Sequence, residues 1–154
     1  MANNCSVRVT IRGDVNPIVD WVKSQDWSHG NLPVDGERYF FDVQIENHVD
    51  GCIELFFWTK WCPPLDELKR MAEKYCVDIN GEYEELGMAM MGGFGFGSRE
   101  YHVWLDDSDW NKLDYDEDND TYTEKSTGEL VDSYIGYYWD LLEMKMVEHL
   151  KQTR

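Results

Sequence analysis

Four aspartates at alternating positions have the spacing that most suggests chemistry. They follow the first ligands of an EF-hand calcium loop, and they are Asp114, Asp116, Asp118 and Asp120. Such a loop also needs glycine at its sixth position and a bidentate glutamate at its twelfth. Counted from Asp114, those positions hold Asn119 and Lys125, so the pattern is not that of an EF-hand. Weak calcium binding by so many carboxylates stays open.

The other familiar motifs for catalysis or metal binding are incomplete. The four histidines are scattered without H-x-x-x-H spacing, and the four cysteines have no C-x-x-C spacing, so the sequence predicts no zinc site. It contains no P-loop, nucleophile elbow or HEXXH sequence. We therefore expect no catalytic residues, no metal site and no cofactor. A carboxylate-dependent metalloenzyme assembled from distant residues is the least favoured of three hypotheses.

A Gly-Phe-Gly-Phe segment at residues 93–96 matches the centre of the RNA-recognition signature, in which strand aromatics stack on bases. The basic first position of that signature is Gly92 here, and the segment follows the second predicted helix instead of preceding it. A formal net charge of −17 also opposes direct binding to nucleic acid or to an anionic membrane, since both need a basic face. We expect a strand whose glycines permit close packing or a bulge.

Acidic residues are concentrated in one stretch of the chain. Residues 106–132 hold 11 of the 31 acids and only two bases, Lys112 and Lys125. Because like charges repel one another, this stretch is either a solvated loop or a surface for a positively charged partner. Trp110, Tyr115 and Tyr122 lie among the acids, and such rings can anchor an interface or pin a loop to the core. Both interpretations stay open from the sequence alone.

The partner-binding interpretation assigns specific residues to the contact. Acids would imitate phosphates, and two rings would supply buried contact area. Duplex DNA about 40 Å long, the width expected of this chain, carries roughly 20 to 25 phosphate charges, which is comparable with the charge of the protein. The predicted partner-binding residues are Asp106, Asp107, Asp109, Trp110, Asp114, Tyr115, Asp116, Glu117, Asp118 and Asp120.

Length and composition indicate one globular domain. The chain has 154 residues, of which 42% are hydrophobic and 14% aromatic, enough for a buried core. The N-terminus lacks the basic and apolar regions of a signal peptide, and the longest uncharged apolar run, residues 87–97, is too short to span a bilayer. The cysteines are therefore expected to be reduced thiols, and the protein is expected to be cytoplasmic.

The hydrophobic pattern predicts an α+β fold of the ferredoxin-like class. Alternating apolar residues and helical spacing predict a strand, a helix, two strands, a helix and a strand, at residues 5–12, 17–25, 39–46, 52–59, 65–75 and 77–86. This βαββαβ order is that of a ferredoxin-like antiparallel sheet. Two further strands, at residues 87–98 and 101–105, would extend the sheet or form a separate hairpin.

The C-terminal third is expected to add an acidic loop and a helix. The predicted loop covers residues 106–125. Ser126 to Glu129 fits a capping box, which predicts a C-terminal helix over residues 126–151. Together with a ferredoxin-like core at residues 1–105, these segments are predicted to form a single domain over residues 1–154.

Three short segments carry a resemblance to a known family. They are Asn3-Asn4-Cys5, the run Trp58-Thr59-Lys60-Trp61-Cys62-Pro63-Pro64, and Tyr83-Glu84-Glu85. With them the chain resembles the YubB-like, ferredoxin-like family of small proteins from phages, plasmids and integrated elements. The resemblance covers about residues 2–105, and it implies a ferredoxin-like domain and a mobile-element origin. It implies no catalytic residues, and the acidic stretch and C-terminal helix lie outside it.

These observations predict a non-enzymatic binding protein of a phage or plasmid, acting in the cytoplasm of a bacterial host. As an acidic nucleic-acid mimic it would occupy the basic surface of a host nucleic-acid-binding or defence protein, such as a CRISPR effector, and inhibit it. Neither nucleic acid nor a membrane is expected to bind it directly. The alternative is a structural module that forms a homo-oligomer through a free sheet edge or the C-terminal helix.

Overall fold

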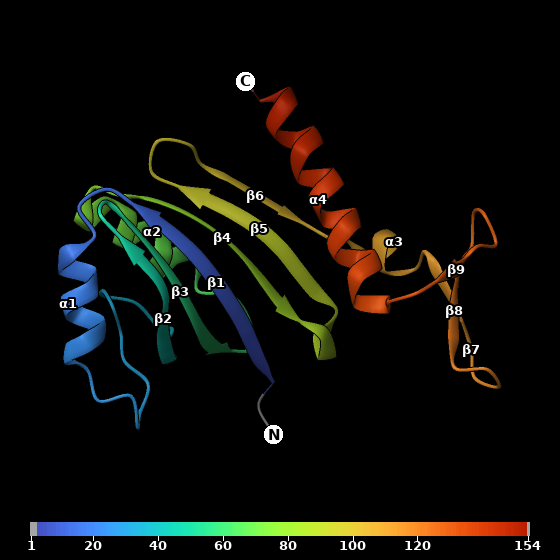
Figure 1. Ribbon diagram of the computed structural model, residues 1–154, viewed down its shortest axis with the longest axis horizontal. Coiled ribbons are helices and arrows are strands. Elements are labelled where there is room, and N and C mark those ends of the chain that lie inside the picture. The colour runs from blue at the N-terminus through green and yellow to red at the C-terminus, as the bar shows by residue number, and fades with distance from the viewer. Residues whose placement is uncertain (1–2, 154) are drawn as a thin grey trace. The chain divides into compact units, whose positions relative to one another are not determined.

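The computed structural model describes residues 3–153, and the chain divides into two compact units. The first unit ends at His102 and the second begins at Val103. A six-stranded sheet belongs mainly to the first unit, and a three-stranded sheet lies in the second (Figure 1). Among residues 3–153, no helix combines the length and the apolar character needed to cross a bilayer.

The first unit contains the ferredoxin-like βαββαβ arrangement. In chain order its elements are β1 (Asn4–Arg12), α1 (Asn16–Ser24), β2 (Phe41–Val49), β3 (Cys52–Lys60), α2 (Leu65–Tyr75), β4 (Asp78–Glu85), the 3-10 helix η1 (Leu86–Met88), β5 (Met90–Phe96) and β6 (Tyr101–Trp104), which reaches the unit boundary. The strand order is β2-β3-β1-β4-β5-β6. The first four strands and two helices confirm the predicted fold class, and β5 and β6 extend the sheet beyond β4.

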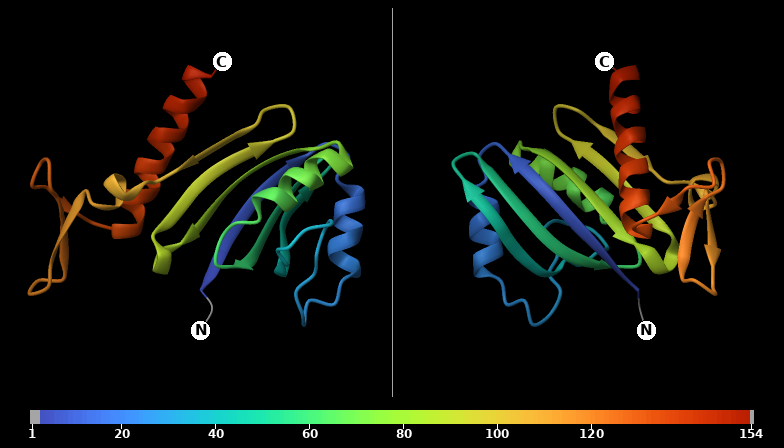
Figure 2. Two further views of the ribbon diagram at one scale, coloured as in Figure 1. Left: turned by 180° about the vertical axis from the view of Figure 1, so that it is seen from behind. Right: turned by 45° about the vertical axis from the view of Figure 1, so that its right-hand side comes forward.

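Alternation along the strands builds the core of this unit. Val7, Val9 and Ile11 of β1 are buried, while the residues between them lie on the other face of the sheet. Helices α1 and α2 cover the same face of the sheet (Figure 2), and Ile18 of α1 and Leu68 of α2 belong to the same buried cluster. The hydrophobic pattern thus decides which face of each element is buried.

Glycines allow close approach within the sheet. A Cβ atom at Gly81 of β4 would lie 2.6 Å from the Arg8 carbonyl oxygen and 2.6 Å from the Phe94 ring. In β5, a Cβ atom at Gly92 would overlap the Tyr83 ring. The predicted role of the β5 glycines in close packing is therefore confirmed.

The second unit is more ordered than the acidic loop that the sequence predicted. It contains α3 (Asp107–Trp110), β7 (Leu113–Asp116), β8 (Thr121–Glu124), β9 (Leu130–Val131) and α4 (Tyr134–Gln152). The prediction of a loop over residues 106–125 is wrong, because β7 and β8 form an antiparallel hairpin in this stretch. Tyr115 and Tyr122 face each other across it with ring centroids 4.8 Å apart. This cross-strand aromatic pair stabilises strand structure despite the acidic composition.

The predicted start of the C-terminal helix is also wrong. Residues 125–128 form the turn between β8 and β9, where Gly128 has a φ of 73°. Val131 pairs with Tyr122 in the sheet instead of starting a helix. The helix α4 begins at Tyr134, and its N-cap is Ser133, whose Oγ accepts a hydrogen bond from the Gly136 amide at 3.0 Å. The capping pattern at residues 126–129 therefore starts no helix, because the residues that follow it pair with β8 as strand β9.

Candidate partner-binding surface

Two of the predicted contact residues hold the start of α3 in place. The Asp106 side chain accepts a hydrogen bond from the Asp109 amide at 3.0 Å, and the Asp109 carboxylate accepts one from the Asp106 amide at 2.9 Å. This reciprocal capping box satisfies two backbone donors that the helix itself leaves free. The Asp106 pKa falls to about 2, first because Ser108 donates a hydrogen bond to its carboxylate and then because the Asp109 amide does so.

Asp109 also forms the most buried ion pair of the second unit's described residues. Its side chain is only 9% exposed, and its Oδ2 atom lies 2.6 Å from Lys145 Nζ on α4. Lys145 further donates a hydrogen bond to the Trp104 carbonyl oxygen at 3.2 Å. The pair therefore joins the start of α3 to the middle of α4. Lys145 was missed by sequence reasoning because it lies 36 residues away and belongs to no motif.

Trp110 packs within its own unit. Its ring lies 4.4 Å from the Tyr138 ring, and the Tyr138 hydroxyl donates a hydrogen bond to the Trp110 carbonyl oxygen at 3.0 Å. The indole Nε1 is buried and has no hydrogen-bond partner among the described residues. The sequence left open whether this ring anchors a partner or pins the acidic segment. Its position fits the second role.

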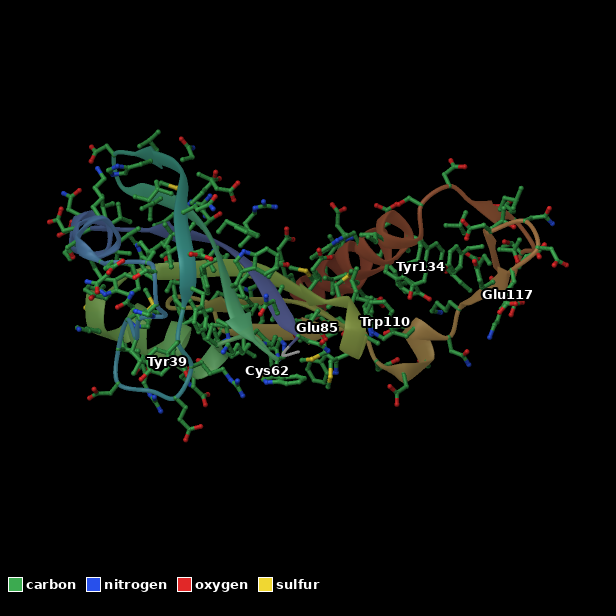
Figure 3. All side chains as sticks on the ribbon, turned by 90° about the horizontal axis from the view of Figure 1, so that it is seen from below. Tyr39, Cys62, Glu85, Trp110, Glu117 and Tyr134 are labelled. Carbon is green, nitrogen blue, oxygen red and sulfur yellow. The ribbon has the colours of Figure 1, made fainter. Side chains whose placement is uncertain are left out.

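Five aromatic rings form a continuous series, here called the aromatic ladder. Successive ring centroids are 4.4 to 5.1 Å apart, and the series runs Tyr115, Tyr122, Tyr134, Tyr138 and Trp110. It connects β7 and β8 to α4 and α3 through the inner face of the hairpin. Aromatic pairs at these separations stabilise by about 0.5–1.5 kcal/mol each beyond area burial. The ladder therefore fixes the hairpin against α4, and Figure 3 labels Tyr134 at the start of that helix.

The opposite face of the hairpin is acidic. Asp114 pairs with Thr123 and Asp116 with Thr121, so these four side chains share the face that the aromatic ladder does not use. Asp114 and Asp116 are exposed. Lys125 Nζ lies 3.8 Å from Asp114 Oδ1. Among the described residues no ion pair involves Asp116, so this face keeps negative charge.

The hairpin turn, residues 117–120, adds further acids in a fixed conformation. Asp116 Oδ1 accepts a hydrogen bond from the Asp118 amide at 3.0 Å, and Asp116 Oδ2 accepts one from the Asn119 side chain at 2.8 Å. The Asn119 side chain is the main cause of a lowered Asp116 pKa. Asp120 has a φ of 51° and accepts a hydrogen bond from the Tyr115 hydroxyl at 2.7 Å, which raises the Tyr115 pKa. Glu117, labelled in Figure 3, is exposed at the end of the hairpin. Asp118 beside it is exposed as well.

We call the segment from Leu113 to Glu124 the acidic hairpin. It brings together six predicted contact residues, namely Asp114, Tyr115, Asp116, Glu117, Asp118 and Asp120. Asp107 is exposed on α3 and lies outside the hairpin. Tyr115 remains half exposed, so its ring is accessible as well as supporting the ladder. The hairpin is the part of the prediction that the fold assembles into one surface.

A second acidic feature lies beside the start of α4. A pocket of about 330 Å³ is lined by four carboxylates together with apolar and hydroxyl groups, and its acids are Glu124, Glu129, Asp132 and Asp140. Tyr137 and Leu130 also line it. The Glu124 pKa is lowered, chiefly by a hydrogen bond from the Ser126 hydroxyl and then by one from Tyr137. Sequence reasoning missed this pocket because its acids come from one strand, two connecting segments and a helix.

The alternating aspartates are not gathered around a common centre. Asp116 accepts hydrogen bonds from its own turn, Asp120 accepts one from Tyr115, and Asp114 lies near Lys125. Within residues 3–153, no group of three or more histidine, cysteine or acidic side chains has the arrangement of a metal site. The aspartates of the hairpin therefore form separate contacts with different groups of their own unit.

Fold and surface define a class of protein: a ferredoxin-like α+β protein with an acidic hairpin in its second unit. A comparison with protein families matches residues 40–136 to the ferredoxin-like domain of Api92-like proteins, and the chain belongs to this family. The match includes the whole acidic hairpin and the first three residues of α4. The hairpin is thus part of the family domain, although the resemblance seen in the sequence stopped near residue 105. Searches of curated proteins and of solved structures found no match.

Proposed function

We propose that the protein is a non-enzymatic binding protein whose acidic hairpin occupies the basic surface of a partner. One observation carries this proposal. The hairpin exposes acidic side chains on one face, while the aromatic ladder on its other face fixes it against α4. A hairpin held in one conformation loses little conformational entropy when it binds, which favours affinity. A passive solvated loop would need neither the ladder nor the hydrogen-bonded turn.

The charge of the second unit supports a nucleic-acid-binding partner. Residues 103–154 contain fourteen acids and five bases, so about half of the net charge of −17 lies in about a third of the chain. Asp114 and Asp116 lie on one face of a strand, at positions about 6.6 Å apart for a rise of about 3.3 Å per residue. Two anions held on one face of a strand can replace phosphates on a basic surface. Association would be fast at low salt and weaken as salt rises.

The partner we favour is a host nucleic-acid-binding or defence protein, such as a CRISPR effector, which binding would inhibit. In this proposal the chain is a YubB-like protein of a phage or plasmid and acts in the bacterial cytoplasm. The resemblance of its N-terminal two thirds supports the mobile-element origin, and the acidic hairpin supports mimicry of nucleic acid. Inhibition would be steric and electrostatic competition, with no catalytic residue, metal or cofactor.

The test neutralises exposed acids of the hairpin that do not hold its turn. The variant combines Asp114→Asn, Glu117→Gln and Asp118→Asn and keeps Asp116, whose carboxylate accepts the turn hydrogen bonds. A matched control removes the same charge from exposed positions of the first unit through Asp20→Asn, Asp42→Asn and Glu73→Gln. Both variants should keep the thermal stability of the wild type or exceed it, because each relieves like-charge repulsion.

Tagged wild-type protein and both variants serve as bait in nuclease-treated bacterial lysate, at low and then moderate salt. Wild type and control should recover one nucleic-acid-binding protein, which salt and competing DNA release. The hairpin variant should not recover it. Undiminished recovery by the hairpin variant would refute the proposal. Recovery of the bait alone, with a mass that rises with concentration, would favour the alternative of a self-associating structural module.

A further inference from the structure

The outer face of α4 carries an apolar groove with an acidic rim. Met144 is 69% exposed and Val147 is 47% exposed, whereas Tyr138 and Leu142 of the same helix are buried. An open surface space of about 530 Å³ lies over this face, and every residue that lines it belongs to α4. Its lining residues are Asp140, Glu143, Met144, Val147, Glu148 and Lys151, and we call it the α4 groove.

Helical spacing makes this groove a straight stripe. Asp140, Met144, Val147 and Lys151 follow one another at intervals of four, three and four residues, so they lie along one line of the helix. The stripe is about 16 Å long for eleven steps of about 1.5 Å. Glu143 and Glu148 lie on its two sides. A helix with an apolar stripe between charged residues typically packs against the apolar stripe of another helix.

We propose that the α4 groove binds an amphipathic helical segment with basic residues beside its apolar face. The apolar residues of that segment would cover Met144 and Val147, which are otherwise exposed to water. Its lysines or arginines would meet the rim, which has three carboxylates and one ammonium group. Charge complementarity of this kind selects the partner and its orientation. The inference goes beyond the proposed role of the acidic hairpin and uses none of its residues.

The charges disfavour a second copy of this chain as the occupant. In a parallel pair of α4 helices, Glu143 of one copy would face Glu148 of the other, and like residues along the stripe would meet, including Asp140. In an antiparallel pair Asp140 would meet Lys151, but Glu143 would face Glu143 and Glu148 would face Glu148, on molecules that each carry −17. Like charges at helix contacts are destabilising. A basic helix removes this conflict.

The test uses a fluorescent 18-residue peptide of leucine and lysine with leucines at helical spacing. A scrambled peptide of the same composition measures attraction by charge alone. The groove variant combines Met144→Ser and Val147→Ser, and a matched control combines Met88→Ser and Val49→Ser, which are also exposed. Anisotropy titrations near physiological salt compare the wild type, both serine variants and the acidic hairpin variant.

We expect the wild type to bind the amphipathic peptide about tenfold or more tightly than the scrambled one, a difference of about 1.4 kcal/mol. The groove variant should lose most of that preference, and the serine control and the hairpin variant should keep it. Equal binding of both peptides, or an unaffected groove variant, would overturn the inference. So would a concentration-dependent dimer that the groove variant abolishes. Loss of the lysate partner by the hairpin variant tests only the proposed function, so the two proposals fail separately.

Discussion

The buried ion pair between Asp109 and Lys145 makes a quantitative prediction about stability. Asp109→Asn keeps an oxygen that can accept the Asp106 amide hydrogen but removes the negative charge facing Lys145, 2.6 Å away. Hydrogen bonds to charged groups contribute about 1.5–3 kcal/mol. Because the Lys145 side chain is 31% exposed and regains contact with water, we expect a loss in the lower part of that range, about 2 kcal/mol.

Asp109→Ala should cost more, because it also removes the capping hydrogen bond to the Asp106 amide. A lost cap typically costs about 1 kcal/mol, which brings the expected decrease to about 3 kcal/mol. Urea unfolding at pH 7, followed by far-UV circular dichroism, measures both changes. Asp107→Asn is the matched control, since Asp107 is exposed in the same turn, and it should change the unfolding free energy by less than about 0.5 kcal/mol.

A double-mutant cycle with Lys145→Met separates the ion pair from other effects of substitution. If the pair stabilises α3 against α4, Asp109→Asn in the Lys145→Met background should cost at least about 1 kcal/mol less than in the wild type. Strict additivity would show that the two groups are independent. An Asp109→Asn protein as stable as the Asp107→Asn control would refute the reasoning, because the carboxylate would then contribute no more than an exposed one.

Three further predictions concern acid stability, packing and thiol reactivity. The Asp106 pKa is lowered from 3.8 to about 2 in the folded protein. The stability that this carboxylate contributes should therefore be complete above about pH 4 and be lost as the pH falls toward 2. Asp106→Asn should flatten this part of the curve of unfolding free energy against pH. Gly81→Ala should lower the unfolding free energy in urea by about 1–3 kcal/mol, because its Cβ atom would lie 2.6 Å from the Arg8 carbonyl oxygen. Cys5, buried with a pKa raised to about 12, should react with a thiol reagent only after unfolding, whereas exposed Cys76 reacts in the native protein.

Each of these three predictions has an outcome that contradicts it. An unchanged acid transition in Asp106→Asn would mean that the carboxylate has the same pKa in the folded and unfolded chain. Wild-type stability of Gly81→Ala would show that β1 and β4 can separate without cost. Native-state labelling of Cys5 at the rate of Cys76, located by mass spectrometry, would show that the buried strand end opens readily.

The sequence by itself determined the ferredoxin-like part of the fold. Alternation in residues 5–12 and 52–59, and helical spacing after Pro63-Pro64, are local patterns that follow directly from which face each element buries. Because β1 pairs with β3 and β4 in the usual order for this βαββαβ arrangement, element order was enough to predict the topology. The net charge and its concentration in residues 106–132 were likewise visible without a structure.

Only the tertiary structure decided what the acidic stretch becomes. Composition predicted an acidic loop, but the Tyr115–Tyr122 pair and the contact of Tyr122 with Tyr134 convert it into a hairpin fixed on α4. These contacts depend on strand register and on the starting point of α4, which a local capping pattern misplaced. Likewise, Asp109 acts within the fold because Lys145 reaches it from 36 positions away. Charge is a property of the sequence, but whether an acid faces a partner or its own chain is set by long-range packing.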